Sequence, residues 1–357
     1  MNSAISANGA PAVFTQAVDR IPLDAIVVLL REDYGIECVA LEMLSGERDQ
    51  NYRIVDKSGS TFVCKVTHPS EPLNVTASQT RVLQHLAHVT PALPVQHIVP
   101  TLDGRDCITR ATKSTPATTV RVLTYLHGTP MHQATPSAAT RRSLGTCHAQ
   151  LIAALATLDG IDTEPDLLWD LTHIERVEPL LASIPSADDR ALAQQFLHLH
   201  RAHAEPGAGK LRTQLIHNDL NPYNLLVDDT SPDIGGILDF GDLVFAPLLN
   251  DVAIAASYLI GSDGDPLTGV CDYLAAFHHQ LPLQPGEINA LFPLIGGRLV
   301  MTVAITEWRA TLHPENRKYI LRNNLSAWQG LRRLSTLSLG DARARFHEVC
   351  QTAGEQP

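Results

Sequence analysis

The sequence predicts an α+β protein in two lobes, a small β-rich lobe followed by a larger helical lobe. The order of the hydrophobic patterns indicates this, because short segments rich in β-branched residues come first and helical periodicity dominates afterwards. The chain of 357 residues also exceeds the usual size of one compact domain, so two cores are expected. Its 44% of hydrophobic and 18% of charged residues are typical of an ordinary globular protein.

The same patterns predict where the lobes begin and end. Residues 1–14 are small, polar and proline-containing, so we expect them to form a flexible tail. The small lobe is expected at 15–123 and the helical lobe at 129–357. Helices of the large lobe are expected at 137–158, 187–204, 249–260, 266–280 and, with breaks, 286–334.

The small lobe is predicted to contain a five-stranded antiparallel sheet plus a helix. Turn-rich stretches such as SGERDQ and DKSGS separate the strand candidates. A helical period over 72–88 places Val82, Leu83 and Leu86 on one side of that helix. The strand candidates are CVALEML, NYRIV, TFVCKVT, the segments on either side of Asp103-Gly104, and TVRVLTYL.

Charge and composition exclude several classes of partner. With 27 basic and 38 acidic residues, the net charge of -11 makes binding to a nucleic-acid backbone unfavourable. No stretch approaches the roughly 18 unbroken apolar residues of a membrane span, and the N-terminus lacks the pattern of a secretory leader. The six cysteines are scattered without a C-x-x-C pair, which is typical of reduced thiols. A cytoplasmic protein that binds neither nucleic acid nor membrane is therefore expected.

A predicted hairpin lies within the helical half of the chain. Residues 224–227 and 236–238 are short strand candidates, and the turn-forming sequence DDTSPDIG lies between them. Such a hairpin brings the loop before its first strand close to the residue after its second. Asp219, Asn224 and Asp239 are therefore expected to converge.

These three residue types suit phosphoryl transfer. Mg²⁺ prefers oxygen ligands, often one or two carboxylates plus substrate phosphates, and Asn224 and Asp239 can supply such oxygens. An acceptor hydroxyl needs a further carboxylate that orients it and takes its proton, which is the role that fits Asp219. Any one of the three residues would ordinarily be a solvated turn residue, so the inference depends on the set.

The spacing of these residues resembles the catalytic loop and metal-binding triplet of the protein-kinase-like superfamily. His217-x-Asp219-x-x-x-x-Asn224 precedes Asp239-Phe240-Gly241 in that order. The resemblance implies a bilobal protein-kinase-like fold that uses ATP and Mg²⁺. It also implies that Asp219 is the catalytic base, that His217 orients the loop, and that Asn224 and Asp239 hold the metal.

Other features separate the chain from protein kinases. Asn221 stands where protein kinases place a lysine, and only eleven residues lie between Asp239 and Asp251, too few for a protein-substrate platform. The chain instead resembles the aminoglycoside phosphotransferase and choline kinase family, and within it most of all the hydroxylysine kinase branch and the kinase-like domains fused to some aminotransferases. Segments such as LSGERDQNYRI, VRVLTYLHG and IHNDLNPYNLLV carry this resemblance.

The resemblance implies an activity and a class of acceptor. A small-molecule kinase of this branch transfers the γ-phosphoryl group of ATP to the hydroxyl of an amino acid or amino alcohol, so a small amine-bearing substrate and a monomer or homodimer are expected. Two alternatives stay open. One is phosphorylation of an aminoglycoside or homoserine, and the other is a non-catalytic nucleotide-binding protein of the same fold.

The family pattern also predicts a nucleotide site. Lys65 lies on the third strand, where the superfamily's lysine reaches the α and β phosphates. A glutamate on the following helix normally pairs with that lysine, but Gln79 occupies the matching place and Glu71 is an upstream candidate. The other predicted nucleotide-binding residues are Gly46 and Asn51 of the turn at 45–51, and Thr124, Tyr125 and Leu126 of a hinge at 124–128.

Acceptor-site residues are predicted from the helical lobe. Asp170, Arg298 and Asp242 are candidate substrate contacts, whereas Trp169 and Trp308 are expected to be core residues first. Asp251 resembles the aspartate that braces the catalytic loop through backbone N–H groups.

Overall fold

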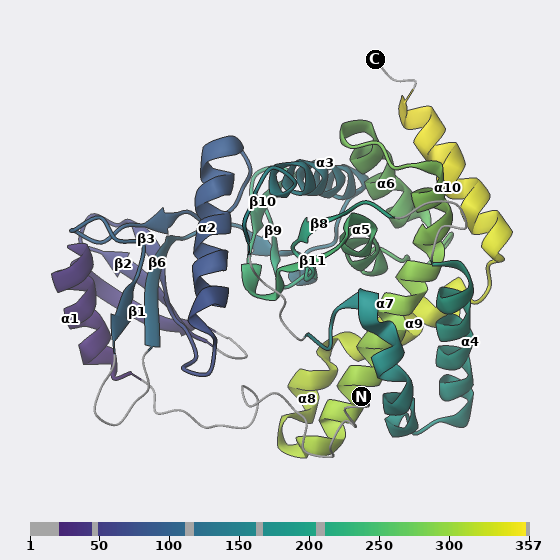
Figure 1. Cartoon of the computed structure of the whole chain (residues 1–357), viewed down its shortest axis with the longest axis horizontal. Helices are drawn as coiled ribbons and strands as arrows, with labels where there is room; N and C mark the ends of the chain where they lie inside the picture. Colours follow the sequence, from purple (N-terminus) through teal and green to yellow (C-terminus); the bar gives the residue numbers. More distant parts are fainter. Residues whose placement is uncertain (1–20, 45–48, 111–117, 162–166, 205–210, 355–357) are drawn as a thin grey trace. The chain divides into compact units, whose positions relative to one another are not determined.

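The computed structural model of the chain is shown in Figure 1. It describes residues 21–44, 49–110, 118–161, 167–204 and 211–354. The predicted tail at 1–14 and Gly46 lie outside these residues. The chain divides into two compact units, and the main boundary falls between Leu126 and His127. The first unit comprises Met1–His88 and Val95–Leu126, and the second comprises Val89–Pro94 and His127–Pro357.

The first unit is built on an antiparallel sheet of six strands, where the sequence predicts five. All six candidate segments form strands, because the segments on both sides of Asp103-Gly104 each pair with β6, so the predicted number of five is one too few. The strand order is β1-β2-β3-β6-β4, with β5 also paired to β6. The strands are β1 (Cys38–Leu44), β2 (Gln50–Asp56), β3 (Thr61–Val66), β4 (Ile98–Val99), β5 (Ile108–Arg110) and β6 (Thr118–Thr124).

The two faces of this sheet carry different chemistry. Helix α1 (Leu23–Tyr34) packs on one face, where its apolar side meets alternate residues of β2, β3 and β6 in a hydrophobic core. Helix α2 (Leu73–Val89) lies on the other side of the sheet (Figure 1). Lys65 of β3 pairs in register with Asn51 of β2 and Arg121 of β6, so these three polar side chains share one face.

The second unit is mainly helical, and the predicted helices are found close to their expected bounds. The sequence did not predict η3, which contains Pro179 and is kinked at His173, or α10, whose apolar residues are sparse. The helices are α3 (Ala138–Leu155), η3 (Leu171–Ser183), α4 (Ala187–His203), α5 (Leu248–Ser257), α6 (Thr268–Gln280), α7 (Pro285–Leu312), α8 (Arg317–Ile320), α9 (Asn324–Leu334) and α10 (Leu339–Gly354). Short 3₁₀ turns are η2 (Met131–Gln133), η4 (Phe240–Asp242), η5 (Pro314–Asn316) and η6 (Leu321–Asn323).

Short strands hold the predicted hairpin in the second unit. Strand β9 (Leu225–Val227) pairs antiparallel with β10 (Ile234–Ile237), which confirms that prediction, and β7 (Thr129–Pro130) extends the pair. A separate two-stranded sheet joins β8 (Thr213–Ile216) to β11 (Val244–Pro247). The two ends of the hairpin region are thereby held close to the loop that follows β8.

Helix α7 is the central helix of the second unit. It is apolar and long enough to cross a membrane, but 94% of its apolar stretch of 18 residues is buried inside the protein, as is typical of a core helix. It packs against η3, α4, α5 and α9. Its first turn is fixed by a capping box between Gln284 and Glu287, and the buried Glu287 accepts two hydrogen bonds from Arg212 at 2.8 and 2.7 Å.

Helices α3 and α6 approach each other at backbone distance. A Cβ added at Gly145 would overlap the carbonyl oxygen of Tyr273 and would lie 2.9 Å from the backbone nitrogen of Phe277. Glycine is therefore required here by the close contact of two backbones. The contact also brings His148 of α3 against Tyr273 and Phe277 of α6.

We expect Gly145→Ala to destabilise the protein. The added methyl group must push the backbones of α3 and α6 apart, and overpacking of this kind costs about 1–3 kcal/mol. Gly340→Ala in α10 is the matched control, because the nearest atom to its added Cβ is Ser338 Oγ at 3.7 Å. Thermal or urea unfolding of both variants checks this, and equal unfolding midpoints would contradict it.

Candidate active site

A buried carboxylate shapes the loop that contains Asp219. Asp251, in the first turn of α5, is 0% exposed. Its Oδ2 accepts a hydrogen bond from the backbone N–H of His217 at 3.1 Å, and its Oδ1 accepts one from Asn218 N–H at 2.7 Å. Asn218 has a left-handed backbone with φ of 66°. Asp251 thus braces the loop through backbone N–H groups, as the sequence predicts.

A second pair of side chains supports Asp251 from behind. His148 Nε2 lies 3.2 Å from Asp251 Oδ2, and His148 Nδ1 lies 2.7 Å from the hydroxyl of Tyr273. Burial alone would raise the pKa of Asp251, but the hydrogen bonds from the His148 ring and from the backbone N–H of Asn218 lower that pKa below its ordinary value. Sequence reasoning missed His148, because its only signal is a polar residue within an apolar helix.

His217 connects the loop to the hairpin. Its Nε2 donates to the carbonyl oxygen of Leu238 at 3.0 Å, and its Nδ1 accepts from the backbone N–H of Asp219 at 3.2 Å. Both bonds are satisfied by a neutral imidazole that carries its proton on Nε2. Burial lowers the pKa of His217, which favours that neutral form. This geometry fits the predicted role of His217 in orienting the loop.

The two oxygens of Asp219 have different surroundings. Oδ2 accepts hydrogen bonds from Asn221 Nδ2 at 2.9 Å and Asn224 Nδ2 at 2.8 Å. Oδ1 faces Arg298 Nη2 at 3.5 Å, and the side chain is 25% exposed. Burial raises the pKa of Asp219 to about 6, although Arg298 and the two amides oppose this rise. Oδ1 is thus the oxygen with capacity left for an acceptor hydroxyl.

Asn224 and Asp239 stand on either side of the hairpin. The backbone N–H of Leu238 donates to Asn224 O at 2.8 Å, which joins the start of β9 to the end of β10. Asp239 follows with a left-handed backbone, φ 59°, and its charge raises the pKa of Asp219. Asn224 Nδ2 donates to Asp219, so the side-chain oxygen Oδ1 of Asn224 can face a metal ion as a ligand.

The donor set of these two residues suits a hard divalent cation. Both supply oxygen, and within the described ranges no group of three or more His, Cys, Asp or Glu residues could hold a metal by itself. Mg²⁺ usually takes one or two protein oxygens and completes its shell with phosphates and water. Asn224 and Asp239 fit that pattern.

Arg298 of α7 reaches the loop from the core. It is 2% exposed, its Nη1 donates to Trp169 O at 3.3 Å, and its guanidinium lies 5.1 Å from the centre of the Trp169 ring. The structure therefore brings together Asp219 and one of the three predicted substrate residues. The other two are Asp170, whose Oδ1 caps η3 by accepting from Thr172 N–H at 2.9 Å, and Asp242 at the end of η4. Their substrate roles remain predictions.

In the first unit, the predicted lysine has an acidic neighbour that sequence reasoning missed. Lys65 Nζ lies 3.7 Å from Asp49 Oδ2, and both side chains are 17% exposed. Asp49 Oδ1 also accepts a hydrogen bond from the backbone N–H of His68 at 3.0 Å. The acid beside Lys65 thus comes from the turn before β2.

Gln79 corrects one expectation. The sequence places it where a helix residue would pair with Lys65, but its Oε1 accepts a hydrogen bond from Arg121 Nη2 at 2.8 Å. Arg121 is 1% exposed and also donates to Thr80 Oγ1 at 3.2 Å. A buried guanidinium needs acceptors more strongly than a partly exposed ammonium does, and this explains the choice of partner.

The remaining predicted nucleotide-binding residues differ in whether their hydrogen-bonding groups already have partners. Asn51 Oδ1 is buried without a hydrogen-bond partner in the described part of the chain. The backbone N–H groups of Thr124 and Tyr125 already donate to His97 O at 2.9 Å and Thr61 O at 3.4 Å. Of the predicted hinge residues, Leu126 is therefore the best candidate for backbone contact with adenine.

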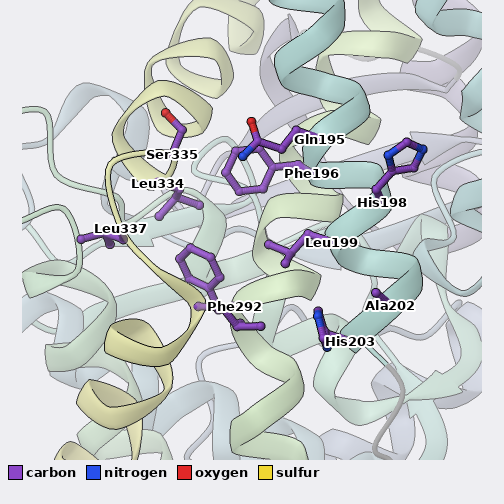
Figure 2. A pocket seen from close by; sticks show the side chains of 11 residues that line it. Gln195, Phe196, His198, Leu199, Ala202, His203, Phe292, Leu334, Ser335 and Leu337 are labelled. Carbon is purple, nitrogen blue, oxygen red and sulfur yellow. The ribbon is translucent and has the colours of Figure 1, made fainter.

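A cavity of about 340 Å³ also lies in the second unit (Figure 2). Apolar side chains of α4, α7 and α9 form much of its lining, including Phe196, Phe292 and Leu334. None of the predicted site residues lines it, so it is separate from the group around Asp219.

Curated relatives match this chain along most of its length. Hydroxylysine kinase of Mus musculus is 24% identical over an alignment of 347 positions that covers 91% of this chain and 90% of the relative. Hydroxylysine kinase of Danio rerio is 26% identical over an alignment of 334 positions that covers 89% of this chain and 92% of the relative.

Solved structures share the fold, which confirms the predicted α+β, kinase-like architecture. A microcompartment-associated aminopropanol kinase superposes with a TM-score of 0.65 at 19% identity and covers 93% of this chain and 99% of its own. An amicoumacin kinase in complex with AMP-PNP and Ca²⁺ has a TM-score of 0.63 at 15% identity, with coverage of 84% and 93%. Residues 40–281, more than half of the sequence, match the family model directly, so the chain belongs to the phosphotransferase enzyme family.

Proposed function

We propose that this protein is an ATP- and Mg²⁺-dependent kinase. It transfers the γ-phosphoryl group of ATP to a hydroxyl of an amino acid or amino alcohol that resembles hydroxylysine. The observation that carries the proposal is that the two carboxylate oxygens of Asp219 have different partners. Oδ2 is held by two side-chain amides, whereas Oδ1 points toward Arg298 and can accept a hydroxyl proton. The names of the relatives, hydroxylysine kinase and aminopropanol kinase, support an acceptor that carries both a hydroxyl and an amine.

The residues of the second unit divide the work of the reaction. Asp219 orients the acceptor hydroxyl and takes its proton, and His217 and Asp251 keep the loop in place. Asn224 and Asp239 would hold Mg²⁺, which neutralises charge on the phosphates when bound. Lys65 of the first unit would steady the phosphates through its ammonium group.

The choice of nucleotide and metal follows from relatives and donor chemistry. The amicoumacin kinase structure contains AMP-PNP and Ca²⁺, and a spectinomycin phosphotransferase structure contains ADP. One carboxylate and one amide oxygen give few protein ligands, which suits Mg²⁺ better than the larger Ca²⁺.

The state of the thiols supports a reducing compartment. All six cysteines of the chain are free, and burial raises the pKa of Cys64 and Cys350 to about 12, which keeps them as unreactive thiols. Cytoplasmic location is therefore part of the proposal.

Asp219→Asn should remove turnover while nucleotide binding persists. The amide cannot take the hydroxyl proton, and a positioned base contributes typically about 10²–10⁴-fold to rate. Steady-state kinetics and titration with Mg-ATP check the two properties separately. Unaltered turnover in this variant would sink the assignment of the base.

Asp239→Ala should weaken Mg-ATP binding by at least about tenfold, because even groups behind a metal ligand contribute that much to metal affinity. Asp233→Ala is the matched control, since Asp233 is an exposed carboxylate of the same hairpin. Calorimetric titration with ATP at varied Mg²⁺ measures the difference. Equal affinities for the two variants would remove Asp239 from the metal site.

Mg²⁺-dependent ATP consumption should rise when hydroxylated amines are added to the wild-type protein. A panel that contains hydroxy amino acids, amino alcohols and aminoglycosides tests the acceptor class in one assay. Binding of Mg-ATP without consumption on any acceptor would instead favour a non-catalytic protein of this fold.

A further inference from the structure

A buried arginine of α7 joins three segments that are far apart in the sequence. Arg298 is 2% exposed, and its Nη2 lies 3.5 Å from Oδ1 of Asp219 in the loop after β8. Its Nη1 donates to the carbonyl oxygen of Trp169 at 3.3 Å, shortly before η3, and its guanidinium lies 5.1 Å from the centre of the Trp169 ring. The third segment is the end of α5, where Tyr258 follows directly.

Tyr258 is linked to Arg298 by charge and by a hydrogen bond. Burial raises the pKa of the Tyr258 phenol, whereas the charge of Arg298 and a hydrogen bond with its guanidinium lower that pKa. The charge of Asp219 also acts on this phenol, so the three side chains lie in one neighbourhood. Trp169 and Tyr258 are partly exposed, and the Asp219 side chain is 25% exposed. Arg298 is thus the buried member of a group whose other members solvent can reach.

Close packing of α7 fixes the point from which the Arg298 side chain extends. A Cβ added at Gly296 would lie 2.5 Å from Cδ1 of Phe196 in α4, and one added at Gly297 would lie 2.5 Å from Cδ2 of His200 in the same helix. Neither position has room for a side chain, so the backbone just before Arg298 is held against α4. The guanidinium therefore extends from a rigid part of the core.

The contacts of Arg298 depend on the groups that it joins and leave part of its hydrogen-bonding capacity unused. Its Nε is buried and finds no hydrogen-bond partner among the residues that the structure describes. A buried donor without an acceptor is costly, and a cost of this kind is typical of functional sites. The carboxylate of Asp219 offsets the charge of Arg298, while the charge of Asp239 repels Asp219. Arg298 thus holds Asp219 in place against that repulsion.

We propose that Arg298 is a positioning residue that fixes Asp219 relative to Trp169 and Tyr258, and that the carbon chain of the acceptor lies against these two rings. This inference rests on the proposed function and deepens it, because it names the surface that the acceptor contacts beside the base. We call Trp169 and Tyr258 the aromatic wall. A guanidinium that is 2% exposed has almost no surface for a substrate, so Arg298 acts through its neighbours.

The aromatic wall suits the acceptor class of the proposed function. Hydroxy amino acids and amino alcohols join their polar groups by a carbon chain, and such a chain is stabilised when it is buried against an aromatic face. An ammonium group near the same face adds cation–π attraction. A wall at a fixed distance from Asp219 also fixes the place of the acceptor hydroxyl, and a misplacement of about 1 Å can cost about 10²-fold in rate.

Arg298→Met should lower kcat/KM for the best acceptor by about 10²-fold, because Asp219 and the aromatic wall lose their common support. The affinity for Mg-ATP should stay near the wild-type value, since Asn224 and Asp239 are retained. Arg212→Met is the matched control, because Arg212 makes an ion pair with the buried Glu287 in the same unit. The control should lose stability in thermal unfolding and keep the acceptor kinetics. Equal losses of kcat/KM in the two variants would show a structural role and overturn the inference.

A double-mutant cycle separates positioning from independent packing. Trp169→Leu in the wild-type protein should raise KM for the acceptor by about fivefold. In the Arg298→Met background, the same change should alter KM by less than about twofold, because the ring has already lost its place. Equal effects in the two backgrounds overturn the inference. If Arg298→Met does not fold, Arg298→Lys takes its place in the cycle, since it keeps the charge and loses the fork that reaches both Trp169 and Asp219.

Tyr258→Leu tests the second ring of the aromatic wall. It should raise KM for the acceptor while the affinity for Mg-ATP, measured by calorimetry, stays unchanged. If acceptor KM is unaltered in both Tyr258→Leu and Trp169→Leu, the aromatic wall is wrong and the proposed kinase stands. A wild-type protein that consumes no ATP with any hydroxylated amine overturns the proposed function and this inference together.

Discussion

The conformation of the loop that contains Asp219 depends on one buried carboxylate. Asp251 carries a charge in a place without solvent, and such a charge is stable only when hydrogen bonds compensate it. Its donors are the backbone N–H groups of His217 and Asn218 and the ring of His148. Because two of these three donors belong to the loop itself, the loop cannot relax without removing two hydrogen bonds from the buried carboxylate of Asp251. The left-handed backbone at Asn218 is the conformation that this constraint imposes.

Within that loop, side-chain amides hold one oxygen of Asp219. Protein kinases place a lysine near this position, whereas here the amides of Asn221 and Asn224 donate to Asp219 Oδ2. The only cation within 4 Å of Asp219 in the described structure is Arg298, which comes from the core helix α7. The absence of a lysine on the loop leaves room at Oδ1, and a small acceptor needs that room.

The first unit also contains charged side chains that need compensation, Lys65 and Arg121. Its sheet places Lys65 and Arg121 side by side on one face, and like charges at that spacing repel unless each has its own acceptor. Gln79 of α2 accepts from Arg121, and Asp49 lies beside Lys65. Gln79, at the helix position expected to pair with Lys65, therefore binds the buried Arg121 instead. The acid beside Lys65 is Asp49, which directly precedes β2.

The sequence by itself determined what short-range patterns encode: most of the strands and helices, the hairpin, and the spacing of His217, Asp219, Asn224 and Asp239, which the hairpin then brings together. Only the tertiary structure decided which distant residues meet these groups. Arg298 was one of three candidates for the acceptor site, but only the fold separates it from Asp170 and Asp242 by placing it beside Asp219. His148 comes from another helix, and no local pattern marks a side chain that packing will turn toward a loop. The number of strands in the sheet depends on which candidate segments pair, and the partner of Gln79 depends on the unequal costs of burying competing charges, so neither follows from a local pattern.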